Sequence, residues 1–408
     1  MSTYTDASLI VTPNGKKAGK LYALKGADLD VVRAATATYV GSDGLIKTAL
    51  ANEVRFDYTN GSCPSILVEP QRTNLVTYSE QFDNASWTKT RATITSNATT
   101  APDGTLTADK LILSVDNNSH FIQQTGISVT AQIYSATVYA KKAEYDTVRI
   151  LLANYWSPTP SVIFNLTTKS IVSTASATGK ITELNDGWFK LDITATINAA
   201  AGGNAFFSIY GGNNGIISLV GDGTSGIYIW GAQLEAGANA TSYIPTIAST
   251  VTRNADVISK TGISDLIGQT EGTVLCDINL TKLNSDKSLF TIDNGTANEY
   301  IALIRISSNI FRIRLKNSSG AAVTLINSIV INDARCKIGI AYKNGDYAMY
   351  INGVLRGTST NSTNYPTTAL TQFILSNASY GQLNDSYNSV ALWKERLSNE
   401  TLATLTTI

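Results

Sequence analysis

Aromatic rings beside amide side chains are the groups in this sequence best suited to bind a ligand. The candidates lie in two stretches and are Tyr155, Trp156, Tyr210 and Asn213. A flat aromatic face can stack on the apolar side of a sugar ring, and an amide can bond the hydroxyl groups of the sugar. Adjacent residues of a strand point to opposite faces, so one of Tyr155 and Trp156 is exposed if the chain is extended there. The sequence thus predicts a glycan-binding site at these four residues, and the alternative for each is packing at a sheet edge or an interface.

Groups for catalysis are scarce. His120 is the single histidine, so Ser-His-Asp and Cys-His chemistry would both depend on this one residue, which we expect at the surface or at the edge of the core. Paired carboxylates for glycoside hydrolysis could come from any of the 31 acidic residues, because a sequence does not show pairing in space. The glycine-rich run at 221–226 lacks the Lys-Ser/Thr of a nucleotide-binding loop. We therefore predict no catalytic residues and no enzyme activity.

Carboxylates near turns are the candidates for a metal site. Asp103 and Asp109 flank a turn, and Asp222 begins a second one. Calcium prefers about six to eight oxygen ligands, whereas a turn of this kind supplies about three or four. Aspartate is also common as a turn-forming residue. We expect turn formation from these carboxylates, no metal site and no cofactor, and calcium is the one ion that stays open.

The composition restricts the partners. Across 408 residues, 31 basic side chains balance 31 acidic ones, so no net field attracts nucleic acid or anionic lipid. No apolar run approaches the roughly 18 residues that predict a membrane-spanning helix, and the first residues lack the pattern of a secretion signal. We expect no nucleic-acid partner and no membrane insertion. The three cysteines, Cys63, Cys276 and Cys336, are far apart and are expected to be buried apolar residues.

Hydrophobic residues repeat mostly with a period of two, which predicts β-strands. In 311–316, apolar residues alternate with Arg and Lys, and 338–342 and 347–351 alternate likewise around the hairpin turn Asn344-Gly345. The clearest helix signal is at the end of the chain, where Ser398 can cap a terminal helix. Short strands between turns are typical of sandwiches and jelly rolls. We predict an all-β fold with two tandem antiparallel β-sandwich, jelly-roll-like domains.

The chain divides into three segments. Residues 1–70 have short apolar stretches and are predicted to form a β-rich N-terminal segment for attachment or oligomerisation. Residues 71–247 hold four of the five tryptophans and are predicted to form the first sandwich, and residues 248–408 the second. The connector at 243–250 contains a proline and small hydroxyl residues, as is typical of a domain boundary.

Nine short stretches occur in an order and spacing that is fairly specific: Leu67–Leu75, Tyr78–Phe82, Trp87–Lys89, Ala101–Thr105, Thr107–Leu111, Tyr139–Ala143, Asp186–Lys190, Ile229–Glu235 and Ser242–Thr246. Together they resemble a module of virion structural proteins of tailed bacteriophages, over about residues 60–256. The resemblance implies a jelly-roll domain similar to carbohydrate-binding modules. It also implies a place on the virus particle, commonly in a tail fibre, spike or head fibre.

Two stretches of the last segment, 339–353 and 390–398, resemble more loosely the laminin-G or concanavalin-like sandwich. Members of that family often bind glycans, sometimes with calcium. Many members only fill space or hold partners, so binding does not follow from the fold.

Three functions remain. The favoured hypothesis is a fibre or spike subunit of the virion, assembled in the bacterial host cytoplasm, that contacts other virion proteins and associates as a homotrimer. Its sandwich domains would touch host surface polysaccharide weakly, and many copies would supply avidity. The alternative is a capsid- or tail-bound decoration protein with a purely structural role. A capsule-degrading tailspike is the third, and it would need a long β-helix with regular repeats, which the sequence does not show.

Overall fold

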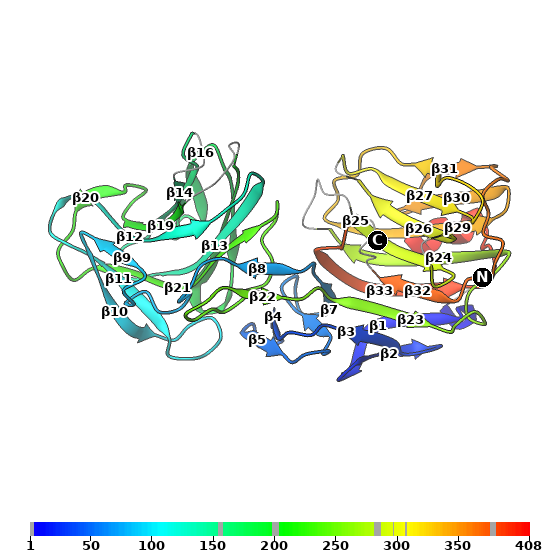
Figure 1. Ribbon diagram of the computed structural model, residues 1–408, viewed down its shortest axis with the longest axis horizontal. Coiled ribbons are helices and arrows are strands. Elements are labelled where there is room, and N and C mark those ends of the chain that lie inside the picture. The colour runs from blue at the N-terminus through cyan, green and yellow to red at the C-terminus, as the bar shows by residue number, and fades with distance from the viewer. Residues whose placement is uncertain are drawn as a thin grey trace. The chain divides into compact units, whose positions relative to one another are not determined.

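The computed structural model describes residues 4–153, 158–197, 204–280, 287–296, 298–306, 308–375 and 381–408. The chain forms two compact units (Figure 1). Unit 1 comprises Met1–Ser42, Thr48–Gln71 and Asn254–Ile408, and unit 2 comprises Asp43–Lys47 and Arg72–Arg253. Both units are built from antiparallel sheets, which confirms the predicted all-β fold class.

Unit 2 is a sandwich of two sheets. The six-stranded sheet has the order β10 (Ala92–Thr99), β11 (Ala108–Leu113), β21 (Gly226–Ala236), β13 (Ile133–Lys142), β18 (Trp188–Thr196) and β17 (Thr178–Glu183). The seven-stranded sheet has the order β16 (Ser170–Ala175), β15 (Ser161–Asn165), β14 (Thr147–Ala153), β19 (Asn204–Gly212), β12 (Asn117–Ser128) and β20 (Ser218–Val220), and β9 (Thr88–Thr90) also pairs with β12. A short pair, β8 (Arg72–Asn74) and β22 (Val251–Arg253), and the 3-10 turn η2 (Asn185–Gly187) complete the unit.

Alternation along the strands creates the core of unit 2. On β14, Val148, Ile150 and Leu152 are buried, and the residues between them are partly exposed. Residues of both sheets meet in one apolar cluster, as the period of two requires when one face of each sheet is covered. Trp188 and Trp230 are buried as predicted.

One large sheet dominates unit 1. Its order is β28 (Val323–Asn327), β27 (Phe311–Lys316), β26 (Tyr300–Arg305), β25 (Lys287–Asp293), β32 (Gln372–Leu375), β23 (Val257–Thr261), β3 (Leu29–Val32), β2 (Lys20–Lys25), β1 (Leu9–Lys17), β33 (Asp385–Trp393), β24 (Glu271–Asn279), β29 (Arg335–Lys343), β30 (Asp346–Ile351) and β31 (Val354–Ser359). The hairpin β6 (Arg55–Asp57) and β7 (Ser65–Val68) joins it through β33. The other elements of unit 1 are η1 (Tyr4–Asp6), β4 (Ala37–Val40) and α1 (Asn399–Thr406). Strand β5 (Ile46–Ala49) pairs with β4 and belongs in part to each unit.

The two ends of the large sheet approach each other. Gly357 on β31 faces Ile326 on β28, and a Cβ at position 357 would lie 2.7 Å from a methyl carbon of Ile326. Only a residue without a side chain allows this approach. The sheet therefore curls around its apolar core.

Strands of the N-terminal segment belong to this same sheet. Strand β1 pairs with β33, and β3 pairs with β23, so residues 1–42 and 48–71 lie in one unit with 254–408. The chain passes between the units on both sides of Asp43–Lys47, after Gln71 and after Arg253. The attachment role of residues 1–70 and the predicted division at 70 and 247 remain predictions.

Several local predictions are confirmed. Strands β29 and β30 pair around Asn344 and Gly345, and Ser398 caps α1 by accepting a hydrogen bond from the Thr401 backbone N–H. Cys276 and Cys336 are buried, but the prediction was wrong for Cys63, which is exposed because its turn contributes to no apolar cluster. Within the residues that the structure describes, no helix has the length and apolar character that crossing a membrane requires.

Candidate functional site

Tyr210 lies on the outer face of the seven-stranded sheet. On β19, Phe207 and Ile209 point into the core, and Tyr210 is therefore directed away from it and is partly exposed. Opposite it on β12 stands Phe121. The two rings stack with their centroids 4.6 Å apart and their planes inclined by 29°. Because each ring covers one face of the other, the pair presents mainly the rims of its two rings outward.

Arg149 extends the same line across the next strand. It stands opposite Tyr210 on β14, and its guanidinium carbon lies 5.2 Å from the centroid of the Tyr210 ring. Nη2 of Arg149 donates a hydrogen bond of 3.1 Å to the Ser161 hydroxyl, which holds the guanidinium in place. We call Phe121, Tyr210 and Arg149 the outer row. It combines a π-surface with a positive charge on three adjacent strands.

The surroundings of the outer row are polar. Gln123 is two residues beyond Phe121 on β12 and shares its face, and Thr90 on β9 stands opposite Phe121. Burial raises the pKa of Tyr210, while the positive charges of Arg149 and Arg91 oppose this rise. Arg91 is held near β12 because its Nε donates to the Ser119 carbonyl at 2.8 Å.

Asn213 lies in the tight turn that follows β19. Its backbone N–H donates to the Ile216 carbonyl at 2.9 Å, and the reverse bond from Ile216 has the same length. Asn214 and Gly215 between them both have positive φ, as a two-residue hairpin turn requires. The structure thus brings Tyr210 together with Phe121 and Arg149 and places Asn213 in a hairpin turn, while glycan contact by its side chain stays a prediction.

Tyr155 and Trp156 lie outside the described residues, so their prediction as glycan contacts stays a prediction. In the sequence they follow Ala153, the last residue of β14, after one intervening residue. Phe121 and Arg149 were missed by sequence reasoning. The alternation of Val148 and Ile150 around Arg149 already directs it outward, but the pairing register that places it beside Tyr210 is not visible locally.

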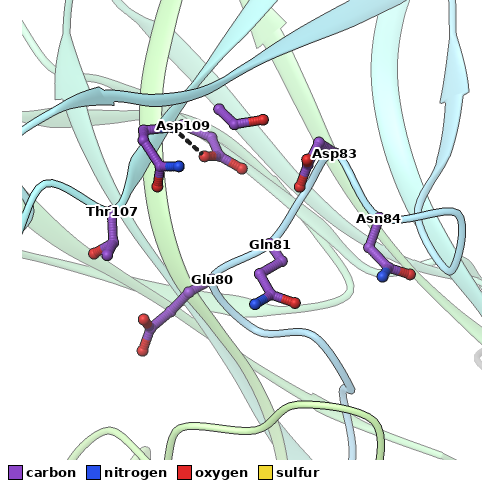
Figure 2. Close-up of a pocket in the computed structure, with 8 residues that line it drawn as sticks. Glu80, Gln81, Asp83, Asn84, Thr107 and Asp109 are labelled. Carbon is purple, nitrogen blue, oxygen red and sulfur yellow. Dashed lines mark hydrogen bonds between the residues drawn. The ribbon is translucent and has the colours of Figure 1, made fainter.

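A second feature of unit 2 is a polar pocket of about 310 Å³ (Figure 2). It is lined by Glu80, Gln81, Asp83, Asn84, Ser96, Asn97, Thr107 and Asp109. The carboxylate of Asp109 accepts hydrogen bonds of 2.9 Å from the backbone N–H groups of Phe82 and Asn97. Asn97 has a φ of 54° at an irregularity of β10, so Asp109 holds a loop and a distorted strand together.

Burial determines the protonation of these carboxyl groups. It raises the pKa of Asp109 to about 6, although the two backbone hydrogen bonds oppose the rise. Burial also raises the pKa of Glu80, against a hydrogen bond of 2.9 Å from the Tyr243 hydroxyl. Among the described residues, no group of three or more His, Cys, Asp or Glu is arranged to hold a metal ion. The contacts of Asp109 account for it as a structural residue.

The other residues considered for chemistry have local partners. Asp103 accepts from the Thr105 backbone N–H at 2.9 Å, and Asp222 accepts from the Thr224 N–H at 2.8 Å, so both form turns as expected. Hydrogen bonds from Ser225 and Thr224 hold the pKa of Asp222 well below its usual range. His120 is buried, and its ring nitrogens lie 2.6 and 2.9 Å from the carbonyl oxygens of Arg91 and Leu219. Of the two expected positions, the surface is thus excluded, because the ring is buried.

No family model and no curated protein matches this chain. Similar solved structures include the CBM40 domain of the Ruminococcus gnavus IT-sialidase bound to α2,3-sialyllactose, with a TM-score of 0.30 and 18% identity over 35% of this chain and 84% of that chain. The NanB sialidase from Streptococcus pneumoniae has a TM-score of 0.31 and 18% identity, over 36% of this chain and 26% of that chain. The SAP-like pentraxin from Limulus polyphemus has a TM-score of 0.26 and 16% identity, over 33% and 69%. At such TM-scores these likenesses are distant, and the site must be judged on its own geometry.

Proposed function

We propose that unit 2 binds glycans through the outer row of its seven-stranded sheet. The observation that carries the proposal is the stack of Phe121 on Tyr210, with the Arg149 guanidinium 5.2 Å from the Tyr210 ring centroid. A pyranose ring presents C–H groups on its faces and hydroxyl groups at its rim. Aromatic rings attract the former, and the amide of Gln123 with the Arg149 donors can bond the latter.

The binding event involves no turnover in this proposal. His120 is enclosed by backbone carbonyl groups, and the Asp109 carboxylate accepts two backbone hydrogen bonds. We propose structural roles for both groups and no acid–base role on a bound sugar. An assay for newly released reducing ends on bacterial polysaccharides is expected to stay at background, and sustained release would favour a depolymerase.

The biological setting of the proposal comes from the sequence resemblance to virion proteins of tailed bacteriophages. We propose a fibre or spike subunit that contacts other virion proteins, associates as a homotrimer and adheres to host polysaccharide. One shallow row supports only weak affinity per site, and several copies on a particle would supply the avidity. Mass measurement of the purified protein tests the trimer, and a particle image tests the location.

The experiment that tests glycan binding uses the full chain. The protein is applied to an array of bacterial and host glycans, and the affinity for the best ligand is then measured for wild type, Tyr210→Ala and Tyr58→Ala. Tyr58 is a partly exposed tyrosine of unit 1 and serves as the matched control. We expect Tyr210→Ala to weaken binding and Tyr58→Ala to leave it unchanged. Equal affinities in all three proteins would remove the outer row as the site, and no binding to any glycan would favour the structural decoration protein.

A further inference from the structure

Charge is distributed unequally between the two sheets of unit 2. The described strands of the seven-stranded sheet contain no Asp or Glu, as their sequences show. The six-stranded sheet carries four acidic residues in its strands, namely Asp109, Glu183, Asp192 and Glu235. A ligand on the outer face of the seven-stranded sheet thus meets no carboxylate from the strands beneath it.

Two arginines, one on a strand and one in a connection, place positive charge near the outer row. Arg149 lies beside the Tyr210 ring on β14, and Arg91 follows β9 and is fixed to the Ser119 carbonyl of β12. Both guanidinium groups are close enough to Tyr210 to influence its ionisation. Among the described residues, no carboxylate forms an ion pair with either arginine. Other cations of unit 2 do form such pairs, as Lys169 does with Glu183 and Lys141 with Asp186. The positive charge on this face is therefore available to a ligand.

We infer that the outer row selects anionic glycans, in which a carboxylate or sulfate group contacts Arg149 while the sugar ring packs on the exposed rims of the Phe121 and Tyr210 rings. This inference rests on the proposed function and names the class of its ligand. A guanidinium beside an aromatic ring binds a carboxylate or sulfate through charge-assisted hydrogen bonds, and the ring positions the sugar that bears it. Because the net charge of the whole chain is zero, the preference is a property of this face and not of the protein as a polyelectrolyte.

The test compares polymers that differ only in charge. The full chain is titrated with polygalacturonate and with its fully methyl-esterified form, and separately with dextran sulfate and dextran, at low salt. We expect the charged polymer of at least one pair to bind about tenfold more tightly than its neutral partner. The preference is expected to decrease as salt increases. The two pairs distinguish carboxylate from sulfate.

Variants separate the inference from the proposed function. Arg149→Gln is expected to abolish the preference for the charged polymer while neutral glycans still bind, and Arg149→Lys is expected to restore part of the preference. Lys180→Gln is the matched control, because Lys180 is an exposed cation on the six-stranded sheet. Tyr210→Ala is expected to weaken binding of both polymers.

Equal affinity for the charged and neutral polymers would overturn the anionic preference and leave glycan binding intact. If Lys180→Gln and Arg149→Gln reduced the preference for the charged polymer equally, this would also overturn it, because the preference would then depend on the overall charge of the protein and not on Arg149. Failure of all four polymers and of every glycan on the array to bind would contradict the proposed function itself.

Discussion

The rings of Phe121 and Tyr210 stack with centroids 4.6 Å apart across the β12–β19 pair. The two residues come from strands that are distant in the sequence, and their neighbours Ile122 and Ile209 point into the core. The core thus fixes the position of both strands, and the strands fix the stack. A rigid platform of this kind lowers the entropic cost of binding a sugar ring.

Replacing Phe121 by Ala should weaken glycan binding more than it weakens the fold. The ring is partly exposed and contributes one half of the stacked surface. We expect an affinity loss of roughly threefold to tenfold and a decrease of at most about 1.5 kcal/mol in the free energy of unfolding. Calorimetric titration with the best array ligand and urea denaturation measure the two quantities. A large loss of stability with unchanged affinity would contradict the platform.

Unit 1 contains a buried ionic cluster that should be sensitive to the loss of one charge. Asp256 accepts hydrogen bonds from Arg33, at 2.7 Å, and from Arg55, which also bonds Glu69 at 2.7 Å. Asp256→Ala removes a carboxylate that pairs with two buried guanidinium groups. We expect the free energy of unfolding to decrease by about 3–5 kcal/mol. Lys343→Gln, which breaks the exposed pair with Glu271, serves as the control and should cost about 0–1 kcal/mol. Similar costs for both variants in urea denaturation would show that the cluster is not a major source of stability.

The carboxylate of Glu299 should make unit 1 less stable in acid. Burial alone would raise its pKa, but hydrogen bonds from Thr368, Thr367 and Ser318 outweigh burial and lower the pKa to about 2. Because the folded state binds the proton more weakly than the unfolded chain, this group stabilises the protein above about pH 4.5 and loses that contribution as the pH falls toward 2.

Glu299→Gln measures the size of this contribution. We expect the variant to lose about 1–3 kcal/mol of unfolding free energy at pH 7. The donors of Thr367 and Thr368 then face a neutral amide, which accepts hydrogen bonds less strongly than a carboxylate does. The gap between wild type and variant should narrow at pH 3. A gap that stays constant between pH 7 and pH 3 would contradict the lowered pKa.

Asp109 should have the opposite pH dependence in unit 2. Its pKa is raised to about 6 by burial, so the folded state binds the proton more tightly than the unfolded chain. The stability that it contributes is therefore full below about pH 4 and decreases as the pH rises through 6. Relative to Asp109→Asn, which does not titrate, wild type should gain stability when the pH is lowered from 7 to 5. Urea denaturation of both proteins at the two pH values checks the sign, and a relative loss at pH 5 would show that the hydrogen bonds outweigh burial.

The fold could be predicted where a local pattern determines it. Alternation in 311–316 and the Asn344-Gly345 turn correspond to β27 and to the β29–β30 hairpin, because period and turn chemistry are properties of neighbouring residues. The pairing of β1 with β33 joins opposite ends of the chain, and no local pattern encodes it. The N-terminal segment was predicted as a β-rich segment for attachment or oligomerisation, and only the structure shows that its strands pair within the large sheet of unit 1.

The candidate site was predicted in part for the same reason. Tyr210 was found because an aromatic residue beside a glycine-rich turn is a local signal. Its partners Phe121 and Arg149 come from two other strands, and only the register of β12, β19 and β14 unites them. Asn213 was selected for its side-chain amide; its backbone closes the turn that follows β19, and glycan contact by the amide stays a prediction.

The most direct test of glycan binding at the outer row is a map of chemical-shift changes when the best array ligand is titrated into the isotope-labelled full chain. Binding at the outer row predicts that the largest changes fall on backbone amides of β12, β19 and β14, centred on Phe121, Tyr210 and Arg149, and that they saturate with the affinity measured by calorimetry. Changes centred on the pocket around Glu80 and Asp109, or within unit 1, would contradict it.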